Sequence, residues 1–214
     1  MILYGSTLSP FVRKVVAFAA EKGIALDLRP TALGDTDPGF AAASPFRKMP
    51  ALVDDGYSLA DSSAICHYLE AKHPDPALIP AESRARGKTI WYDEFADTIL
   101  FACGGAMFLN RIVAPRFLGR EGDQAAADKA ERETLPPLLD YLEGVIPDSG
   151  YLVGDALTLA DLAVASPFAN LAHCGVTVDE ARYPKVVRYA ASILARPSFA
   201  NPIARETAFL ARTA

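Results

Sequence analysis

Residues 1–23 read MILYGSTLSPFVRKVVAFAAEKG and determine the class of the first part of the chain. The apolar run at residues 2–4 predicts a strand, which Gly5 ends. Ser9 and Pro10 predict the start of a helix, because serine is a good N-cap and proline is favoured at the first helical position. Apolar side chains then recur every three or four residues as far as a terminal glycine. The stretch therefore predicts a strand followed by a helix with one buried face.

The sequence continues in the same manner as far as Pro74. We expect a second strand over residues 24–28 and a loop rich in Gly, Asp and Pro over residues 34–39. A hairpin is expected over residues 51–60, followed by a helix that begins at Ser62 and ends before Pro74. A strand, a helix and a strand, followed by a hairpin and a helix, are typical of a small α/β layered domain.

The rest of the chain favours helices. Three prolines interrupt residues 73–80, so we expect residues 1–75 to form an α/β domain and residues 76–82 to form the linker. Residues 83–214 are then an all-helical domain. Helices are expected in it at residues 83–110, 123–145, 158–171 and 183–194. Two adjacent prolines force a break or a kink in the second of these helices. The third is apolar on nearly all sides, which places it at the buried centre of the domain.

The composition indicates a globular protein and excludes several classes of partner. The chain has 214 residues, 51% of them hydrophobic, and 21 Lys and Arg against 26 Asp and Glu, a formal net charge of −5. We expect no nucleic-acid partner, because no tract of clustered basic residues is present. We expect no membrane segment either, because no uninterrupted apolar run approaches the ~20 residues that a membrane helix needs. We also expect no signal peptide, because the sequence opens on strand-like residues and not on a basic and apolar segment.

Cysteine and histidine are few and widely spaced, at Cys66, Cys103, Cys174, His67, His73 and His173. An odd number of cysteines without Cys-x-x-Cys spacing predicts neither a disulfide framework nor a metal or redox pair. The scattered histidines argue against a zinc site. We therefore expect a reduced, cytoplasmic protein without a bound metal, in which the cysteines are small buried hydrophobic residues.

Ser9 is the first candidate for chemistry, because it stands where a strand leads into a helix N-terminus. The unpaired N–H groups and the helix dipole at that position favour a bound anion, and they would lower the pKa of a thiol docked there. The simpler alternative is that the Ser9 side chain only caps the helix.

Two further candidates lie in the same small domain. A proline directly before a strand, as in Met49–Pro50, suits a cis peptide and would present the backbone of Met49 to an extended peptide ligand. The alternative is a trans proline that opens an edge strand. Ser62 and the N–H groups after it would bind a carboxylate, while Asp61 would favour an amine; together they match the two charged ends of an α-amino acid. The alternative for Asp61 and Ser62 is a capping pair.

Taken together, these features resemble the glutathione transferase family, in its serine-type, bacterial-like form. The matching stretches are residues 3–15, residues 44–52 (SPFRKMPAL), residues 59–69 (LADSSAICHYL), the TLAD of residues 158–161, in which Asp161 forms a capping box, and the terminal helix from Tyr183 to Pro197. The likeness covers nearly the whole chain. It implies a thioredoxin-like N-terminal domain of the form βαβ then ββα, followed by a C-terminal helical bundle domain.

The resemblance also implies a role for each candidate. Ser9 falls where serine-type members place the hydroxyl that hydrogen-bonds the glutathione thiolate, with Tyr4 and Ser6 as alternatives. Since Ser9 is not a cysteine, chemistry through a mixed disulfide is disfavoured. The resemblance assigns the binding of glutathione to Lys48 (the glycine carboxylate), Met49 and cis Pro50 (the cysteinyl backbone), and Asp61 and Ser62 (the γ-glutamyl end).

The chain departs from the family pattern at Arg47, where glycine is usual, and at Ser44, where asparagine is common. Asp61 replaces the more usual glutamate. The pocket for a hydrophobic electrophile is expected between the domains, lined by Phe11, Met107, Phe108 and Arg111. Gly104 and Gly105 in the same helix favour a close helix contact over a kink.

The resemblance therefore implies an enzyme that conjugates the thiolate of reduced glutathione, its co-substrate, to a small hydrophobic electrophile. The same likeness implies a two-fold homodimer. Two alternatives share the fold: a non-catalytic glutathione-binding module, and a glutathione-dependent isomerase, dehalogenase or peroxidase.

Overall fold

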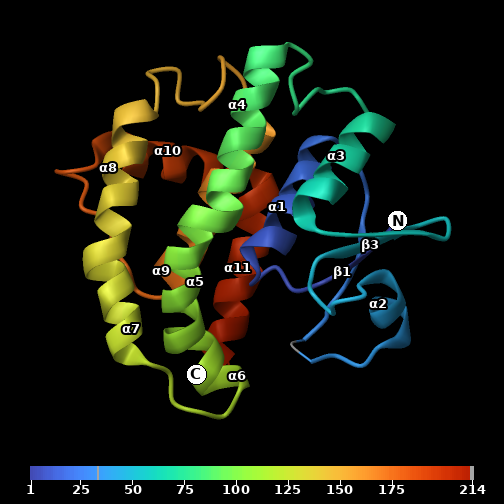
Figure 1. Ribbon diagram of the computed structural model, residues 1–214, viewed down its shortest axis with the longest axis horizontal. Coiled ribbons are helices and arrows are strands. Elements are labelled where there is room, and N and C mark those ends of the chain that lie inside the picture. The colour runs from blue at the N-terminus through green and yellow to red at the C-terminus, as the bar shows by residue number, and fades with distance from the viewer. Residues whose placement is uncertain (33, 213–214) are drawn as a thin grey trace.

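The computed structural model describes residues 1–32 and 34–212. A four-stranded sheet with three helices forms the N-terminal domain, and helices form the C-terminal domain (Figure 1). The long helix that contains α4 and α5, in green, runs between the sheet and the pair α7 and α8. This arrangement is the α/β domain and helical bundle expected from the sequence.

The strands are β1 (Ile2–Tyr4), β2 (Asp27–Arg29), β3 (Ala51–Asp54) and β4 (Tyr57–Ala60). Their order in the sheet is β2-β1-β3-β4, with β1 and β2 parallel and the other two pairs antiparallel. The parallel pair requires the crossover that α1 provides, and β3 and β4 form the expected hairpin. Asp55 and Gly56, both with positive φ, form its two-residue turn.

The three helices of this domain are α1 (Pro10–Glu21), α2 (Pro38–Ala43) and α3 (Ser62–Lys72). Leu3 and Leu52 belong to the core cluster that contains the apolar faces of α1 and α3. Tyr4 and Ala51, the next residues along their strands, pack instead with Phe40 of α2. Because side chains alternate across a strand, α2 covers the face of the sheet opposite to α1 and α3.

Two expectations for this domain were wrong in detail. The second strand begins at Asp27 rather than at residue 24. The segment expected to be a loop contains the start of α2, which Asp37 caps by accepting a hydrogen bond from the Phe40 N–H at 2.7 Å. Asp37 followed by Pro38 is itself a helix-start signal, which the neighbouring glycines obscured.

The first helical stretch of the C-terminal domain is continuous from Ser83 to Phe117 and includes two π-helical segments, η1 and η2. Its parts are α4 (Ser83–Glu94), η1 (Phe95–Leu100), α5 (Phe101–Phe108), η2 (Leu109–Val113) and α6 (Ala114–Phe117). By length and composition alone this stretch would suffice to cross a membrane, with a mean hydropathy of 1.4 over its most apolar window. Core helices of soluble proteins meet the same criterion, and this one packs against α9.

The next helical stretch comprises α7 (Gln124–Lys129), η3 (Ala130–Thr134) and α8 (Leu135–Val145). The break expected from its two prolines takes the form of the π-helical η3. Pro136 and Pro137 lack N–H donors, so the preceding carbonyls lose their ordinary partners and the wider π turn accommodates the loss.

Helix α9 (Leu159–His173) lies at the centre of the C-terminal domain, as expected, and all of its residues from 159 to 171 are buried. Asp161 closes the predicted capping box by accepting a hydrogen bond from the Thr158 N–H at 2.9 Å. The helix packs against α1, α4, α5 and α10 (Pro184–Leu194).

We expected the helix at residues 183–194, which is α10, to be the last one. The structure has a further helix after it, α11 (Pro197–Arg212). Pro197 follows the end of α10 and is also the first residue of α11, where its missing N–H is not needed. Helix α11 packs along α1 and therefore joins the two domains (Figure 1).

Candidate functional site

The predicted segments meet at one edge of the sheet. Tyr4 of β1 pairs with Ala51 of β3, and Ala51 pairs with Ala60 of β4. Because these neighbouring strands are antiparallel, the end of β1, the start of β3 and the end of β4 lie side by side. Three predicted segments leave the sheet at that edge: the loop leading to Ser9, Met49–Pro50 and Asp61–Ser62.

Ser9 occupies the N-cap position of α1 in an extended conformation, yet its side chain makes no capping hydrogen bond. Its backbone is held at both ends, because its N–H donates to the Ser6 carbonyl at 2.9 Å and its carbonyl accepts from the Arg13 N–H at 3.0 Å. The side chain is half-buried. The Ser9 hydroxyl therefore does not cap α1, although it lies at the N-terminus of that helix.

The alternatives Tyr4 and Ser6 have other partners. Tyr4 is buried on the α2 face of the sheet, where its ring packs against Phe40 with 6.0 Å between the ring centroids. Its hydroxyl lies against Gly39, where an added Cβ would come within 2.3 Å of it. The Ser6 hydroxyl accepts a long hydrogen bond, 3.4 Å, from the Leu8 N–H. Tyr4 thus points to the sheet face opposite to α1.

The peptide bond between Met49 and Pro50 is cis, which confirms the cis form expected from the resemblance. Ser44 braces the turn before it: the Ser44 hydroxyl donates to the Lys48 carbonyl at 2.7 Å and accepts from the Lys48 N–H at 2.9 Å. Met49 is half-buried and Lys48 is exposed. The turn therefore holds the Met49 backbone in place while the Lys48 side chain extends into solvent.

Arg47 has a φ of 53°, in the left-handed region that favours glycine. This backbone angle gives the physical reason why glycine is the usual residue there in the family that the sequence resembles. The Arg47 side chain is exposed, and its N–H donates to the Ser44 carbonyl at 2.9 Å.

Asp61 and Ser62 form the N-terminus of α3. Asp61 has a φ of 83°, and its exposed carboxylate caps the helix by accepting from the Ala64 N–H at 3.0 Å. The Ser62 hydroxyl is buried and donates to Asp97 at 3.1 Å. Asp61 therefore caps the helix, as the alternative interpretation expected, whereas the Ser62 hydroxyl contacts Asp97. The N–H groups of Ser62 and Ser63 have no partner within the helix, since they belong to its first turn.

A buried ammonium lies behind that helix N-terminus. Lys14 of α1 donates to Asp93 at 2.7 Å, to Asp97 at 2.6 Å and to the Ser63 hydroxyl at 3.2 Å. Burial alone would lower the pKa of Lys14, but the two carboxylates raise it well above its usual value, so the ammonium stays charged. The cluster joins α1, α3 and the α4–η1 helix.

Asp97 is the most exposed acid of this cluster, with 18% of its side chain accessible. Burial raises the pKa of Asp97; Lys14 opposes that shift, and the nearby charge of Asp93 adds to it. One ammonium facing two carboxylates leaves an excess of one negative charge beside Ser62. This cluster was not predicted from the sequence. A local signal of the cluster was Lys14, which stands with Arg13 between the buried Val12 and Val15.

A second buried ion pair connects the domains. Arg13 of α1 forms two hydrogen bonds with Glu206 of α11, at 3.1 and 2.7 Å, and both side chains are almost completely buried. His173 Nε2 lies 3.0 Å from the same carboxylate. Burial alone would raise the pKa of Glu206, but His173 and the Arg13 guanidinium hold it below its usual value.

An apolar cavity of about 410 Å³ lies along α5 and η2, within the size range of small-molecule sites. It is lined by Phe101, Ala102, Gly105, Ala106, Phe108, Leu109 and Val113. A smaller cavity shares Phe101, Gly105 and Phe108 with it and also contacts Pro10, the residue after Ser9. The apolar lining is therefore continuous from η2 to the start of α1.

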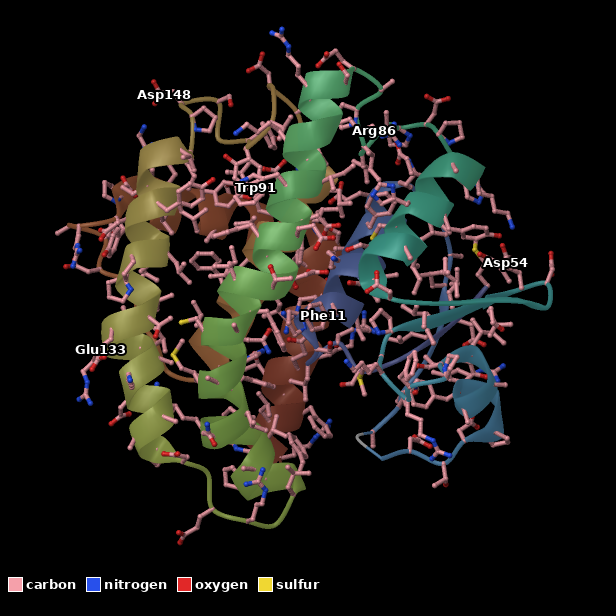
Figure 2. All side chains as sticks on the ribbon, in the orientation of Figure 1. Phe11, Asp54, Arg86, Trp91, Glu133 and Asp148 are labelled. Atoms are coloured by element: carbon pink, nitrogen blue, oxygen red, sulfur yellow. The ribbon has the colours of Figure 1, made fainter. Side chains whose placement is uncertain are left out.

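Of the residues expected to line an electrophile pocket, Phe108 lines both cavities and Phe11 packs on their wall. The Phe11 ring contacts Phe101 with 4.4 Å between the centroids, and Figure 2 shows Phe11 between α1 and α5. Met107 is completely buried in the core, and Arg111 turns away to Asp128 and Glu131, at 2.9 and 2.5 Å. These two side chains are therefore held in other contacts.

The two glycines of α5 have different surroundings. A Cβ on Gly104 would meet only Leu171 of α9, at an ordinary 3.8 Å, whereas a Cβ on Gly105 would come within 3.1 to 3.4 Å of the Phe101 ring. Gly105 thus makes room for the Phe101 ring in the cavity wall.

The cysteines show the burial expected of small hydrophobic residues at Cys66 and Cys103, while Cys174 is half-buried. Burial raises the pKa of the Cys103 thiol to about 11. Among the residues that the structure describes, none of the His, Cys, Asp and Glu side chains form a cluster of three or more that could hold a metal ion.

Comparisons with known proteins show which family the chain resembles. The family model described as the glutathione S-transferase N-terminal domain matches residues 3–77, and the model of the glutathione S-transferase C-terminal domain matches residues 94–197. Glutathione S-transferase 3 of Zea mays is 31% identical over 211 residues, which cover 94% of this chain and 92% of that protein.

Two further proteins are similar to this chain. A probable maleylacetoacetate isomerase 1 of Drosophila melanogaster is 30% identical over 195 residues, covering 87% of this chain and 74% of that one. A glutathione S-transferase from Methylobacterium radiotolerans, solved in complex with glutathione sulfonate, is 29% identical with a TM-score of 0.76 and covers 94% of this chain and 93% of its own. With both domain models matched in order along the sequence, the chain belongs to the glutathione S-transferase family.

Proposed function

We propose that the protein conjugates the thiolate of reduced glutathione to a hydrophobic electrophile, with Ser9 as the residue that stabilises the thiolate. The observation that carries the proposal is the Ser9 hydroxyl at the N-terminus of α1, which makes no capping bond. A hydroxyl donor and the positive end of a helix dipole both favour the thiolate over the thiol. Tyr4, whose side chain lies on the opposite face of the sheet, is less well placed for this role.

The rest of the glutathione molecule would extend along the sheet edge. The Met49 backbone would pair with the cysteinyl part as a strand does, beside cis Pro50, and Lys48 would contact the glycine carboxylate. At the other end, the N–H groups of Ser62 and Ser63 would hold the γ-glutamyl carboxylate. Asp61, together with the excess negative charge at Asp97, would attract the amine.

The electrophile would bind in the apolar cavity of α5 and η2. Its lining reaches Pro10, directly after the proposed thiolate site, and includes Phe101 and Phe108. An apolar ring placed there would lie next to the sulfur without any covalent bond to the protein. Orientation and thiolate stabilisation would then supply the rate.

The proposal is tested by measuring glutathione binding by calorimetry and conjugation of a generic aryl halide. A hydrogen bond to a charged group contributes about 1.5–3 kcal/mol, so Ser9→Ala should lower kcat/KM by about 10- to 100-fold. Tyr4→Phe is the matched control, since it removes the other candidate hydroxyl, and it should leave kcat/KM within about twofold of wild type. A full rate in Ser9→Ala, or no binding of glutathione to the wild type, would contradict the proposal.

A glutathione-dependent isomerase is the second candidate, because one relative at 30% identity carries the name of a probable maleylacetoacetate isomerase. The same thiolate would then add to a double bond and leave again, so no conjugate would accumulate. Incubation with glutathione and an activated cis alkene distinguishes the two, since an isomerase returns the trans alkene. Tight binding of glutathione with no turnover of any electrophile would instead indicate a binding module.

We also propose a two-fold homodimer in a reducing, cytoplasmic setting. Phe46 is 86% exposed next to the Lys48 turn, and Tyr57 of the hairpin and Ile99 of the long helix are also exposed. Apolar side chains on both domains suit a dimer in which the hairpin and α3 of one subunit face the helical domain of the other. Phe46→Ser should shift the mass measured by light scattering from dimer to monomer.

A further inference from the structure

Two polar side chains of the central helix α9 face the loop that carries Ser9. Ser166 and Asn170 are one helical turn apart and are 0% and 3% exposed. Apart from these two residues and Asp161 of the capping box, the buried length of the helix is apolar. The Ser166 hydroxyl donates to the Pro10 carbonyl at 2.8 Å, and the Asn170 amide donates to the Leu8 carbonyl at 2.8 Å. The two acceptors are the carbonyls immediately before and after Ser9.

The orientation of the Asn170 amide is fixed by a charge. Arg13 Nη1 donates to Asn170 Oδ1 at 2.8 Å and to the Ser166 carbonyl at 2.8 Å, so the amide oxygen faces the guanidinium. The amide nitrogen must then face Leu8. Arg13 is itself held by Glu206 of α11, at 3.1 and 2.7 Å. A chain of hydrogen bonds therefore runs from α11 through α1 and α9 to the Ser9 loop.

We propose that Asn170 and Ser166 are positioning residues, which fix the Ser9 hydroxyl relative to the glutathione sulfur by holding the carbonyls on both sides of it. This inference rests on the proposed function. It assigns to the C-terminal domain a part in the thiolate site as well as in the electrophile pocket. Thr7 of the loop before α1 contacts Glu206 of α11, but the short-range contact of the Ser6 carbonyl with the Ser9 N–H does not set the distance of Ser9 from α9.

The consequence is a loss of rate without a loss of glutathione binding. The proposed binding segments, Met49 and Asp61–Ser62, are braced by Ser44 and Asp97 and do not depend on α9. Displacement of the Ser9 hydroxyl by a fraction of an ångström would weaken its bond to the sulfur, because such bonds need close geometry. Substitution of Asn170 should therefore act on kcat much more than on KM for glutathione.

The test is a double-mutant cycle of Ser9→Ala and Asn170→Ala, measured as kcat/KM for a generic aryl halide at neutral pH. Asn170→Ala alone should lower kcat/KM about tenfold, with KM for glutathione changed less than about twofold. In the Ser9→Ala background the same substitution should change kcat/KM by less than about twofold, because the hydroxyl that it positions is gone. Equal losses in both backgrounds would overturn the inference.

Ser198→Ala provides the matched control for Ser166→Ala. Ser198 also lies at the domain boundary and donates to Glu21 of α1 at 2.6 Å, but at the other end of that helix. Ser166→Ala should lower kcat/KM about threefold or more, and Ser198→Ala should stay within about twofold of wild type. Equal effects of the two would contradict a positioning role, and this pair decides the matter if Asn170→Ala does not fold.

The two proposals fail in different ways. If Ser9→Ala and wild type have the same kcat/KM, the proposed role of Ser9 is wrong. If Ser9→Ala is impaired while Asn170→Ala and Ser166→Ala behave as the wild type does, only the positioning inference is wrong.

Discussion

Arg13 and Glu206, which are 193 positions apart in the sequence, form a bidentate ion pair across the domain boundary with side chains 0% and 2% exposed. Removal of one partner leaves a buried charge without compensation, so we expect Glu206→Ala to lower the free energy of unfolding by about 3–5 kcal/mol. Glu206→Gln keeps an acceptor for the guanidinium and should cost about 1–3 kcal/mol. Chemical denaturation measures both.

The pair of Glu21 with Arg196 is the control for that prediction. It also joins α1 to the C-terminal domain, at 2.8 and 2.7 Å, but the Arg196 side chain is 34% exposed. Solvent screens the charge that is left, so Glu21→Ala should cost at most about 2 kcal/mol. If Glu206→Ala costs no more than Glu21→Ala, burial does not determine the strength of the domain contact.

Arg47 offers a stabilising substitution, because its φ of 53° is unfavourable for a side chain with a Cβ. We expect Arg47→Gly to raise the free energy of unfolding by about 0.5–1 kcal/mol. Glycine adopts the left-handed conformation without strain, and its greater freedom in the unfolded chain offsets part of this gain. Arg47→Ala removes the same exposed side chain but keeps the Cβ, so it should change stability by less than about 0.5 kcal/mol. Equal gains from both would refute the conformational explanation.

Asp97 predicts a pH dependence of stability with a definite sign. Burial raises the pKa of the Asp97 carboxyl in the folded protein above 3.8, the ordinary value for an aspartate. The folded state therefore binds the carboxyl proton more tightly than the unfolded chain does. Ionisation of Asp97 therefore costs stability as the pH rises through the folded pKa. Asp97→Asn lacks this titration, so its stability relative to wild type should increase as the pH rises from about 4 through the raised pKa of Asp97 in the folded protein. A relative stability that decreases over this range would contradict the assignment.

A substitution of Gly105 by alanine should have opposite effects on helix stability, which alanine favours, and on electrophile binding, which the new Cβ should weaken. In Gly105→Ala the new Cβ would lie 3.1 Å from the Phe101 ring, which must move within the cavity wall. We expect KM for the aryl halide to rise severalfold with KM for glutathione unchanged. Helix propensity by itself favours alanine by about 1 kcal/mol.

Gly87→Ala in α4 is the control, since a Cβ there would meet nothing within 4 Å. It should bring the gain in helix stability without a change in either KM. If both variants leave the aryl halide KM unchanged, the electrophile does not bind against Phe101.

Local signals in the sequence were sufficient for the elements that position the site. Ser9–Pro10 marked the start of α1, and the Asp-Gly turn with alternating apolar residues marked the hairpin. The errors have local causes as well. A proline such as Pro197 can end one helix and start the next, which hides α11, and α2 is too short for its periodicity to be seen.

The contacts that hold the site together were beyond what the sequence could predict. Lys14 and Asp97 are 83 positions apart, and Asn170 and Leu8 are 162 positions apart. No periodicity relates such positions, because their contact depends on how α9 and the α4–η1 helix pack on α1. The polar residues on the buried faces of α1 and α9 did carry a signal, since a buried charge or amide requires a partner. That signal indicates that partners exist but not which residues they are.

The most direct test of the thiolate role of Ser9 is a titration of glutathione bound to the protein, followed by the ultraviolet absorbance of the thiolate. A free thiol has a pKa of about 8.5, and in the wild-type complex we expect a value about one to two units lower. In the complex with Ser9→Ala the pKa should rise by at least about one unit toward that of the free thiol. Equal thiol pKa values in the two complexes would contradict the role of Ser9.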